Sequence, residues 1–104
     1  MKFVIEWHTR ASGSPAEYVE AGESVLTAFS GWAPPESFTI TEFVARVDGR
    51  GGMLVVETDD LPAIDQLVAR YSAWFDYDVT PVLDVAEGAA QFGEGLAWAK
   101  QAMG

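Results

Sequence analysis

The chain has 104 residues, of which 49% are hydrophobic and 21% charged, with 6 Lys and Arg against 16 Asp and Glu. This length suits one domain over residues 1–104, and the apolar half is ample for a core, which argues against disorder. The formal net charge of −10 disfavours nucleic acid and anionic membrane surfaces as partners, because both are negatively charged. The absence of cysteine excludes disulfides and cysteine nucleophiles. No apolar run approaches the ~20 residues of a membrane span, and acid appears too early for a secretion signal, so we expect a soluble cytoplasmic protein.

The predicted elements alternate between strand and helix along the chain. Aromatic and β-branched runs indicate strands, whereas N-cap residues followed by proline and apolar spacings of three and four indicate helices. The two helix-start sequences are Ser14-Pro15-Ala16-Glu17 and Asp59-Asp60-Leu61-Pro62. We expect strands at residues 3–9, 38–47, 52–58 and 75–85, and helices, caps included, at 14–29, 59–71 and 86–103.

The order β-α-β-β-α-β with a C-terminal helix predicts a fold class. Two split βαβ halves are typical of a ferredoxin-like α+β sandwich, an antiparallel sheet with helices on one face. Right-handed crossovers place the first and third strands at the centre. Pro81 indicates that part of the fourth strand lies at a sheet edge or forms a bulge. The turn Asp48-Gly49-Arg50-Gly51 predicts a hairpin between the second and third strands.

Both faces of the predicted sheet are apolar, although helices cover only one. The first strand alternates Phe3, Ile5 and Trp7 with Val4, Glu6 and His8. Strict alternation in the second strand places Phe38, Ile40 and Val44 opposite Thr39, Phe43 and Val47. The third strand, Met53-Leu54-Val55-Val56, is apolar throughout. Because the chain has no spare helix for the second face, we expect a twofold homodimer in contact through the sheet face.

Three segments resemble a known family. They are Lys2–Arg10, the hairpin Val47–Gly52 running into Val55-Val56-Glu57, and Phe75–Leu83, of which Val79-Thr80-Pro81-Val82-Leu83 is the most specific. Over about residues 1–90 the chain resembles a small bacterial family known as a domain of unknown function (3303-type), within the dimeric α/β-barrel superfamily. The resemblance implies a dimeric barrel with a ligand cavity between sheet and helices. The superfamily includes cofactor-independent monooxygenases, polyketide cyclases, lactone isomerases and haem-dependent enzymes, and the resemblance carries no catalytic motif.

The candidate catalytic residues are His8, Arg46 and Glu57. His8 is the single histidine, and imidazole is the side chain suited to proton transfer near neutral pH. Glu57, on a neighbouring strand, is expected to orient His8 if the register brings them together, and Arg46 to hold a carboxylate or enolate oxygen. The alternatives are a polar strand end for His8 and ion pairs across a dimer seam for Arg46 and Glu57.

Aromatic residues make up 12% of the chain and are candidate walls of a ligand pocket. A site for a flat apolar molecule is lined mainly by such side chains. The alternative is that they pack in the core or at a dimer interface. The candidates are Trp7, Trp32, Tyr71, Trp74, Phe75 and Tyr77.

The sequence leaves open whether the protein is an enzyme. One histidine without cysteine predicts no transition-metal site, and we expect no haem or other cofactor. The first hypothesis is a cofactor-free enzyme of monooxygenase, cyclase or isomerase type acting on a small apolar or aromatic molecule. The second is a non-catalytic small-ligand-binding dimer, and the third a purely structural one. A cavity with His8 or Arg46 exposed to it favours the first, and a cavity without an acid–base pair favours the second.

Overall fold

The computed structural model describes residues 1–104 and contains a four-stranded antiparallel sheet and three helices. The strands are β1 (Lys2–Thr9), β2 (Thr39–Ala45), β3 (Gly51–Glu57) and β4 (Phe75–Val82), and the helices are α1 (Pro15–Ser30), α2 (Leu61–Tyr71) and α3 (Val85–Met103). The order β2-β3-β1-β4 places β1 and β3 at the centre, as right-handed crossovers require. The α+β ferredoxin-like fold predicted from the sequence is confirmed.

Two strands are shorter than predicted. β2 ends at Ala45, because Arg46 already belongs to the turn, where its backbone N–H donates to Gly51 and its guanidinium binds Asp48. β4 ends at Val82, and Val85 begins α3 instead of ending the strand. Pro81 is accommodated because β4 is an edge strand with one neighbour.

The predicted caps start α1 and α2. The Ser14 hydroxyl accepts from the backbone N–H of Glu17 at 3.2 Å, and Glu17 in turn accepts from the backbone N–H of Gly13 at 2.9 Å. Asp60 caps α2 by accepting from the backbone N–H of Ala63 at 3.2 Å. In both helices proline lies in the first turn, where its missing N–H leaves no hydrogen bond unmade.

A bulge in β2 corrects the predicted faces of that strand. The pairing with β3 shifts between Ile40 and Glu42, so Ile40 lies opposite Val56 and Phe43 opposite Leu54. The extra residue moves Phe43 to the helix-covered face and Val44, opposite Met53, to the other face. Strict alternation had placed these two side chains on the reverse faces, and that prediction is wrong.

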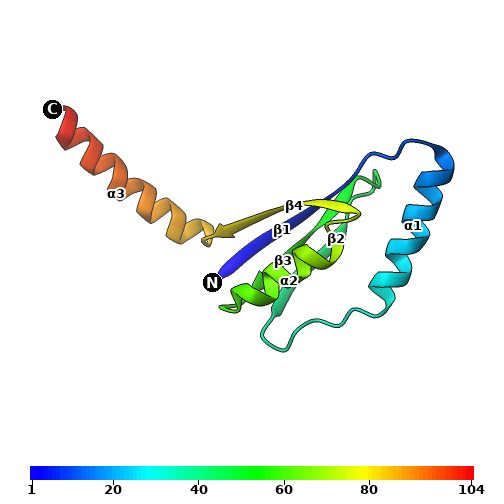
Figure 1. The fold of residues 1–104 in the computed structure, drawn as a ribbon. Coiled ribbons are helices and arrows are strands. Elements are labelled where there is room, and N and C mark those ends of the chain that lie inside the picture. The colour runs from blue at the N-terminus through cyan, green and yellow to red at the C-terminus, as the bar shows by residue number, and fades with distance from the viewer.

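The hydrophobic core is small and lies between the sheet and α2. Its buried members come from β1, β3, the residue before β2, and α2: Phe3, Ile5, Phe38, Leu54, Val56 and Ile64. Neither α1 nor α3 contributes a buried residue. Only 10 of the 104 residues are buried, and the radius of gyration is 18.3 Å, against about 13 Å for a compact domain of this length. Figure 1 shows the cause, since α3 projects away from the sheet at the end opposite to α1.

The second face of the sheet carries no helix. The half-buried side chains Val4, Met53 and Val55 lie at its centre, on the two central strands. Charged residues surround them, including an ion pair of Lys2 with Asp84 at 2.6 Å and one of Arg10 with Asp76 at 3.0 Å. We call this surface the open sheet face.

Candidate functional site

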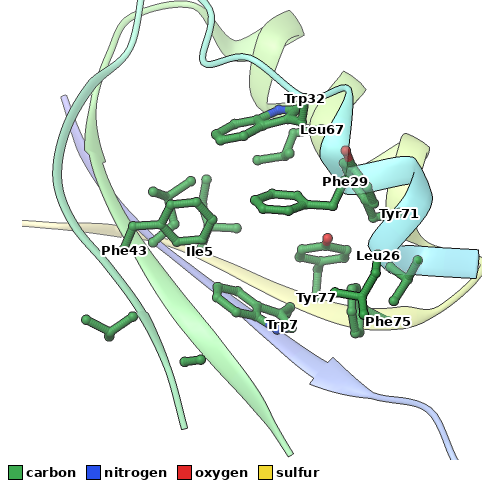
Figure 2. A pocket seen from close by; sticks show the side chains of 14 residues that line it. Ile5, Trp7, Leu26, Phe29, Trp32, Phe43, Leu67, Tyr71, Phe75 and Tyr77 are labelled. Carbon is green, nitrogen blue, oxygen red and sulfur yellow. The ribbon is translucent and has the colours of Figure 1, made fainter. Parts of the chain in front are cut away.

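An apolar cleft lies between α1, α2 and the helix-covered face of the sheet. Its volume is about 420 Å³, within the usual range for small-molecule sites. Figure 2 shows side chains of α1, among them Leu26 and Phe29, facing Trp7 and Phe43 of the sheet across this space. All fourteen lining residues are hydrophobic: Ile5, Trp7, Val25, Leu26, Phe29, Trp32, Phe43, Val44, Ala45, Leu54, Leu67, Tyr71, Phe75 and Tyr77. We call it the aromatic cleft.

Aromatic rings in the lining pack against one another. Trp32 stacks on Phe29 with ring centroids 5.5 Å apart, and Phe43 meets Trp32 edge-on at 5.8 Å and Trp7 edge-on at 5.7 Å. Phe75 meets Tyr77 edge-on at 6.3 Å. Such pairs stabilise ring orientation beyond simple area burial. The walls of the cleft are therefore oriented by mutual contact, while Phe29 and Phe43 remain 42% and 44% exposed at its open side.

Gly52 explains how Trp7 reaches the cleft. The two residues are direct partners in the β1–β3 ladder, on the helix-covered face. A Cβ atom at Gly52 would overlap the indole ring of Trp7 and the backbone carbonyl of Val44. The glycine thus leaves the space over β3 in which the indole lies.

Four of the lining side chains carry a polar group, namely the indole N–H of Trp7 and Trp32 and the hydroxyl of Tyr71 and Tyr77. Burial, with a smaller contribution from Tyr71, raises the pKa of Tyr77 from 10.0 to about 12. The Tyr77 phenol is therefore protonated at neutral pH and available as a hydrogen-bond donor. No carboxylate, ammonium, guanidinium or imidazole lines the cleft, so a neutral ligand matches it best.

Of the aromatic residues predicted as pocket walls, five line the cleft: Trp7, Trp32, Tyr71, Phe75 and Tyr77. Trp74 lies outside it, in the α2–β4 turn, with its ring 6.3 Å from that of Tyr71. Sequence reasoning missed Phe29 and Phe43. The helical spacing of apolar residues in α1 could have identified Phe29. For Phe43, strict alternation predicts the wrong face of the sheet because of the β2 bulge.

His8 lies on the open sheet face, away from the aromatic cleft. Its Nε2 is 3.0 Å from Asp78 Oδ2 and 4.0 Å from Glu6 Oε2. Glu57 is at the other end of β3, opposite Lys2, whereas His8 pairs with Gly51. The register therefore does not bring Glu57 to His8, and Asp78 takes that place.

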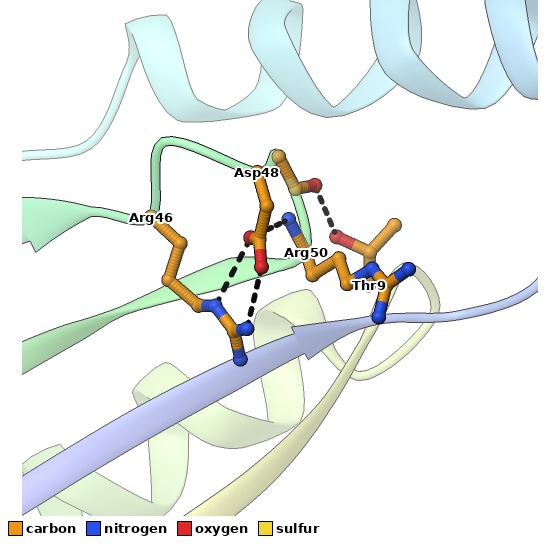
Figure 3. A network of polar contacts seen from close by, with 5 residues as sticks. Thr9, Arg46, Asp48 and Arg50 are labelled. Carbon is orange, nitrogen blue, oxygen red and sulfur yellow. Dashed lines mark hydrogen bonds and ion pairs between the residues drawn. The ribbon is translucent and has the colours of Figure 1, made fainter.

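Arg46 is engaged inside the β2–β3 turn (Figure 3). Its Nε and one terminal nitrogen donate to the two carboxylate oxygens of Asp48, which also accepts from the backbone N–H of Arg50 at 3.0 Å. The hydrogen bonds from Arg46 and Arg50 hold the pKa of Asp48 below its usual value. Gly49, with a φ of 73°, completes the turn, and its carbonyl accepts from the Thr9 hydroxyl at 3.3 Å. This network gives Arg46 a structural role in closing the hairpin.

No group of three or more His, Asp or Glu side chains converges in a way that could hold a metal ion. None of the helices is both long enough and apolar enough to span a bilayer.

Comparison with known proteins identifies the family. The family model described as "Domain of unknown function (DUF3303)" matches residues 1–96. The chain belongs to the DUF3303 family. The match takes in the whole sheet, α1 and α2, and ends within α3. No curated protein and no solved structure matches the chain significantly.

Proposed function

We propose that this DUF3303 protein binds a small, neutral, apolar or aromatic molecule in the aromatic cleft without transforming it. The observation that carries the proposal is the uniform lining, fourteen hydrophobic residues around about 420 Å³. Aromatic faces match a flat ligand, and the tyrosine and tryptophan donors suit a single ligand oxygen. The net charge of −10 disfavours anionic ligands.

A neutral fluorescent naphthylamine, N-phenyl-1-naphthylamine, tests this proposal. We expect its emission to rise on binding to the wild-type protein. Val25→Trp places an indole inside the cleft and should weaken the affinity at least about tenfold, equivalent to about 1.4 kcal/mol. Leu61→Trp, at the exposed start of α2, is the matched control and should bind like the wild type. Equal binding by the Val25→Trp variant, with an unchanged circular dichroism spectrum, would contradict the proposal.

A cofactor-free enzyme of monooxygenase, cyclase or isomerase type is the second candidate. The His8–Asp78 contact at 3.0 Å favours it, since a carboxylate beside an imidazole is a common acid–base arrangement. The pair lies on the open sheet face and no base lines the aromatic cleft, which supports binding over catalysis there. His8→Ala separates the candidates. Binding predicts unchanged naphthylamine affinity, whereas catalysis predicts lost turnover of whatever molecule co-purifies with the wild type.

We also propose that two copies associate through the open sheet face. Val4, Met53 and Val55 form an apolar centre there without a covering helix, which supports sheet-to-sheet contact. Sedimentation velocity at micromolar concentration should show a species of twice 11.3 kDa. A monomer at that concentration would rule the proposal out.

A further inference from the structure

The helix α3 has an apolar stripe along its whole length and no partner in its own chain. Residues at alternating intervals of four and three share one side of the helix: Val85, Ala89, Phe92, Leu96, Ala99 and Met103. Phe92 is 69% exposed, Leu96 55% and Met103 88%. This spacing is typical of a helix that packs against another surface. Glu87 and Glu94 lie on the opposite side, so the stripe itself is uncharged.

The direction of α3 prevents it from covering its own cleft. Two residues separate the helix from β4, and it begins beside the first residue of β1, where Lys2 Nζ binds Asp84 at 2.6 Å. The aromatic cleft extends toward the other end of the sheet, where Trp7, Ala45 and Phe75 line it. Figure 1 shows α3 running outward from the first of these ends, away from α1. At 19 residues the helix is about 28 Å long, so it reaches well beyond its own fold.

The aromatic cleft lacks a cover on the side of α1 and the β2 edge. Leu26 of α1 is 69% exposed although it lines the cleft, and Phe43 of β2, which also lines it, is 44% exposed. β2 is an edge strand, so no further strand shields this side. A ligand in the cleft would therefore keep part of its apolar surface in water.

The solvent-exposed area of the chain indicates what covers the stripe of α3 and the open side of the aromatic cleft. The chain exposes 7539 Å², whereas a compact protein of 11.3 kDa exposes about 5,700 Å². The excess of about 1,800 Å² is more than the ~800 Å² per partner of a standard interface and falls in the range of obligate dimers. Each chain has one projecting stripe and one uncovered cleft. In a closed twofold dimer every stripe can therefore cover one cleft, with none of either left over. A twofold axis perpendicular to the strands also places opposite ends of the two sheets side by side. The α3 helix of one copy therefore begins beside the cleft of the other copy.

We propose that α3 of each copy packs its stripe across the open side of the aromatic cleft in a second copy, so that the partner's Phe92 and Leu96 complete the ligand site. The ligand part of this inference rests on the proposed function, while the helix exchange stands on the exposed stripe and the excess area. Pairing of two α3 helices with each other would bury the stripe but leave the cleft uncovered, and for that reason we favour the exchange.

Engineered cysteines test the exchange without any ligand, because the chain has no cysteine of its own. Mixing the Leu26→Cys and Leu96→Cys proteins under mild oxidation should give a disulfide-linked dimer. The Leu61→Cys and Leu96→Cys mixture is the control and should link at least about tenfold less. A dominant link in Leu96→Cys protein alone would mean that α3 pairs with α3, and the absence of a Leu26–Leu96 link would overturn the proposal.

A pair of charge substitutions connects the exchange to the ligand site. The double variant Phe92→Asp/Leu96→Asp should dimerise more weakly than the wild type and bind the naphthylamine at least about tenfold more weakly. The control Gln91→Asp/Gln101→Asp adds the same charge to the same helix away from the stripe and should match the wild type. If the first variant dimerises more weakly yet binds normally, the partner helix is no part of the site while the proposed function stands. If neither the wild type nor any variant binds, the proposed function fails, and the disulfide pattern still decides the exchange.

Discussion

At the residue scale, the position of Trp7 depends on the missing side chain of Gly52. The indole lies over β3 and reaches Phe43 on the next strand, with ring centroids 5.7 Å apart. This cross-strand contact connects the central strand β1 to the edge strand β2 at the bottom of the cleft. The same glycine therefore serves both the packing of the sheet and the shape of the site.

We expect Gly52→Ala to destabilise the protein by about 2–3 kcal/mol, because the methyl group overlaps the indole and forces Trp7 out of the cleft. Urea unfolding and the tryptophan emission maximum measure the two effects. Gly22→Ala in α1 is the control, since its Cβ meets no atom within 4 Å. Because alanine favours the helix over glycine, this variant should have a free energy of unfolding about 0.5–1 kcal/mol higher than the wild type. Equal stabilities of the two variants would contradict this account of Trp7.

The raised pKa of Tyr77 predicts a loss of folding stability at high pH. Its pKa is raised to about 12 in the folded state by burial, so between pH 10 and 12 the unfolded chain loses this proton while the folded chain keeps it. The contribution of Tyr77 to the free energy of unfolding is complete below pH 10 and declines as the pH rises toward 12. Because Tyr77 is half-exposed, solvent screens this effect, and we expect the free energy of unfolding to fall by about 1 kcal/mol.

Urea midpoints at pH 9.5 and 11.5 measure this decline. The Tyr77→Phe variant should lose less stability over that interval than the wild type. Tyr18→Phe, at a residue that is 61% exposed, should decline like the wild type. A parallel decline of the wild type and Tyr77→Phe would show that Tyr77 titrates normally.

At the element scale, the helices differ in what holds them. α2 is fixed by the buried side chains Ile64 and Tyr71, whereas α1 and α3 have no buried residue. α1 depends on its cap and on contacts of Phe29 with Trp32 and Phe43. α3 contains Gly88, Gly93 and Gly95, which lower the intrinsic stability of an exposed helix. Within one chain, α3 is therefore expected to unfold first.

Gly93→Ala should raise the helix content and the thermal midpoint. Gly93 lies at the side of α3, away from the centre of the stripe, and a Cβ there meets nothing within 4 Å. Alanine favours the helix over glycine by about 1 kcal/mol. Circular dichroism at 222 nm and thermal unfolding check the expectation. A fall in the midpoint would mean that this side of α3 is packed closely against another surface.

At the scale of the whole molecule, charge opposes association while apolar area favours it. Each chain carries a net charge of −10 and exposes about 1,800 Å² more than a compact protein of its mass. Exposed large hydrophobic residues lie in the aromatic cleft and on α3, and the open sheet face has a half-buried apolar centre. The proposed dimer would bury all three in one step.

Salt should strengthen the proposed dimer. Two chains of charge −10 repel each other, and ions screen this repulsion over a Debye length of about 10 Å at 0.1 M. We expect the dissociation constant to fall several-fold between 20 and 300 mM NaCl, as measured by sedimentation velocity. An equal osmolarity of sucrose is the control for excluded volume. A dissociation constant that rises with salt would indicate an interface held by ion pairs.

The sequence by itself determined the order of elements, the caps Ser14 and Asp60, the central position of β1 and β3, and the aromatic character of the site. These features follow from local spacing and from connection rules, which need no knowledge of distant contacts. Five of the six aromatic residues predicted as pocket walls from their residue type line the cleft.

The tertiary structure alone decided which residues meet. The bulge after Ile40 turned Phe43 toward the cleft, because one extra residue exchanges the two faces of a strand. The β1–β3 register placed Glu57 at the opposite end from His8, and the β1–β4 register brought Asp78 to it. The place where α3 begins follows from the end of β4, beside Lys2, whose Nζ binds Asp84 across 82 residues of sequence. Strand register is set by contacts between distant segments, and local sequence patterns do not encode it.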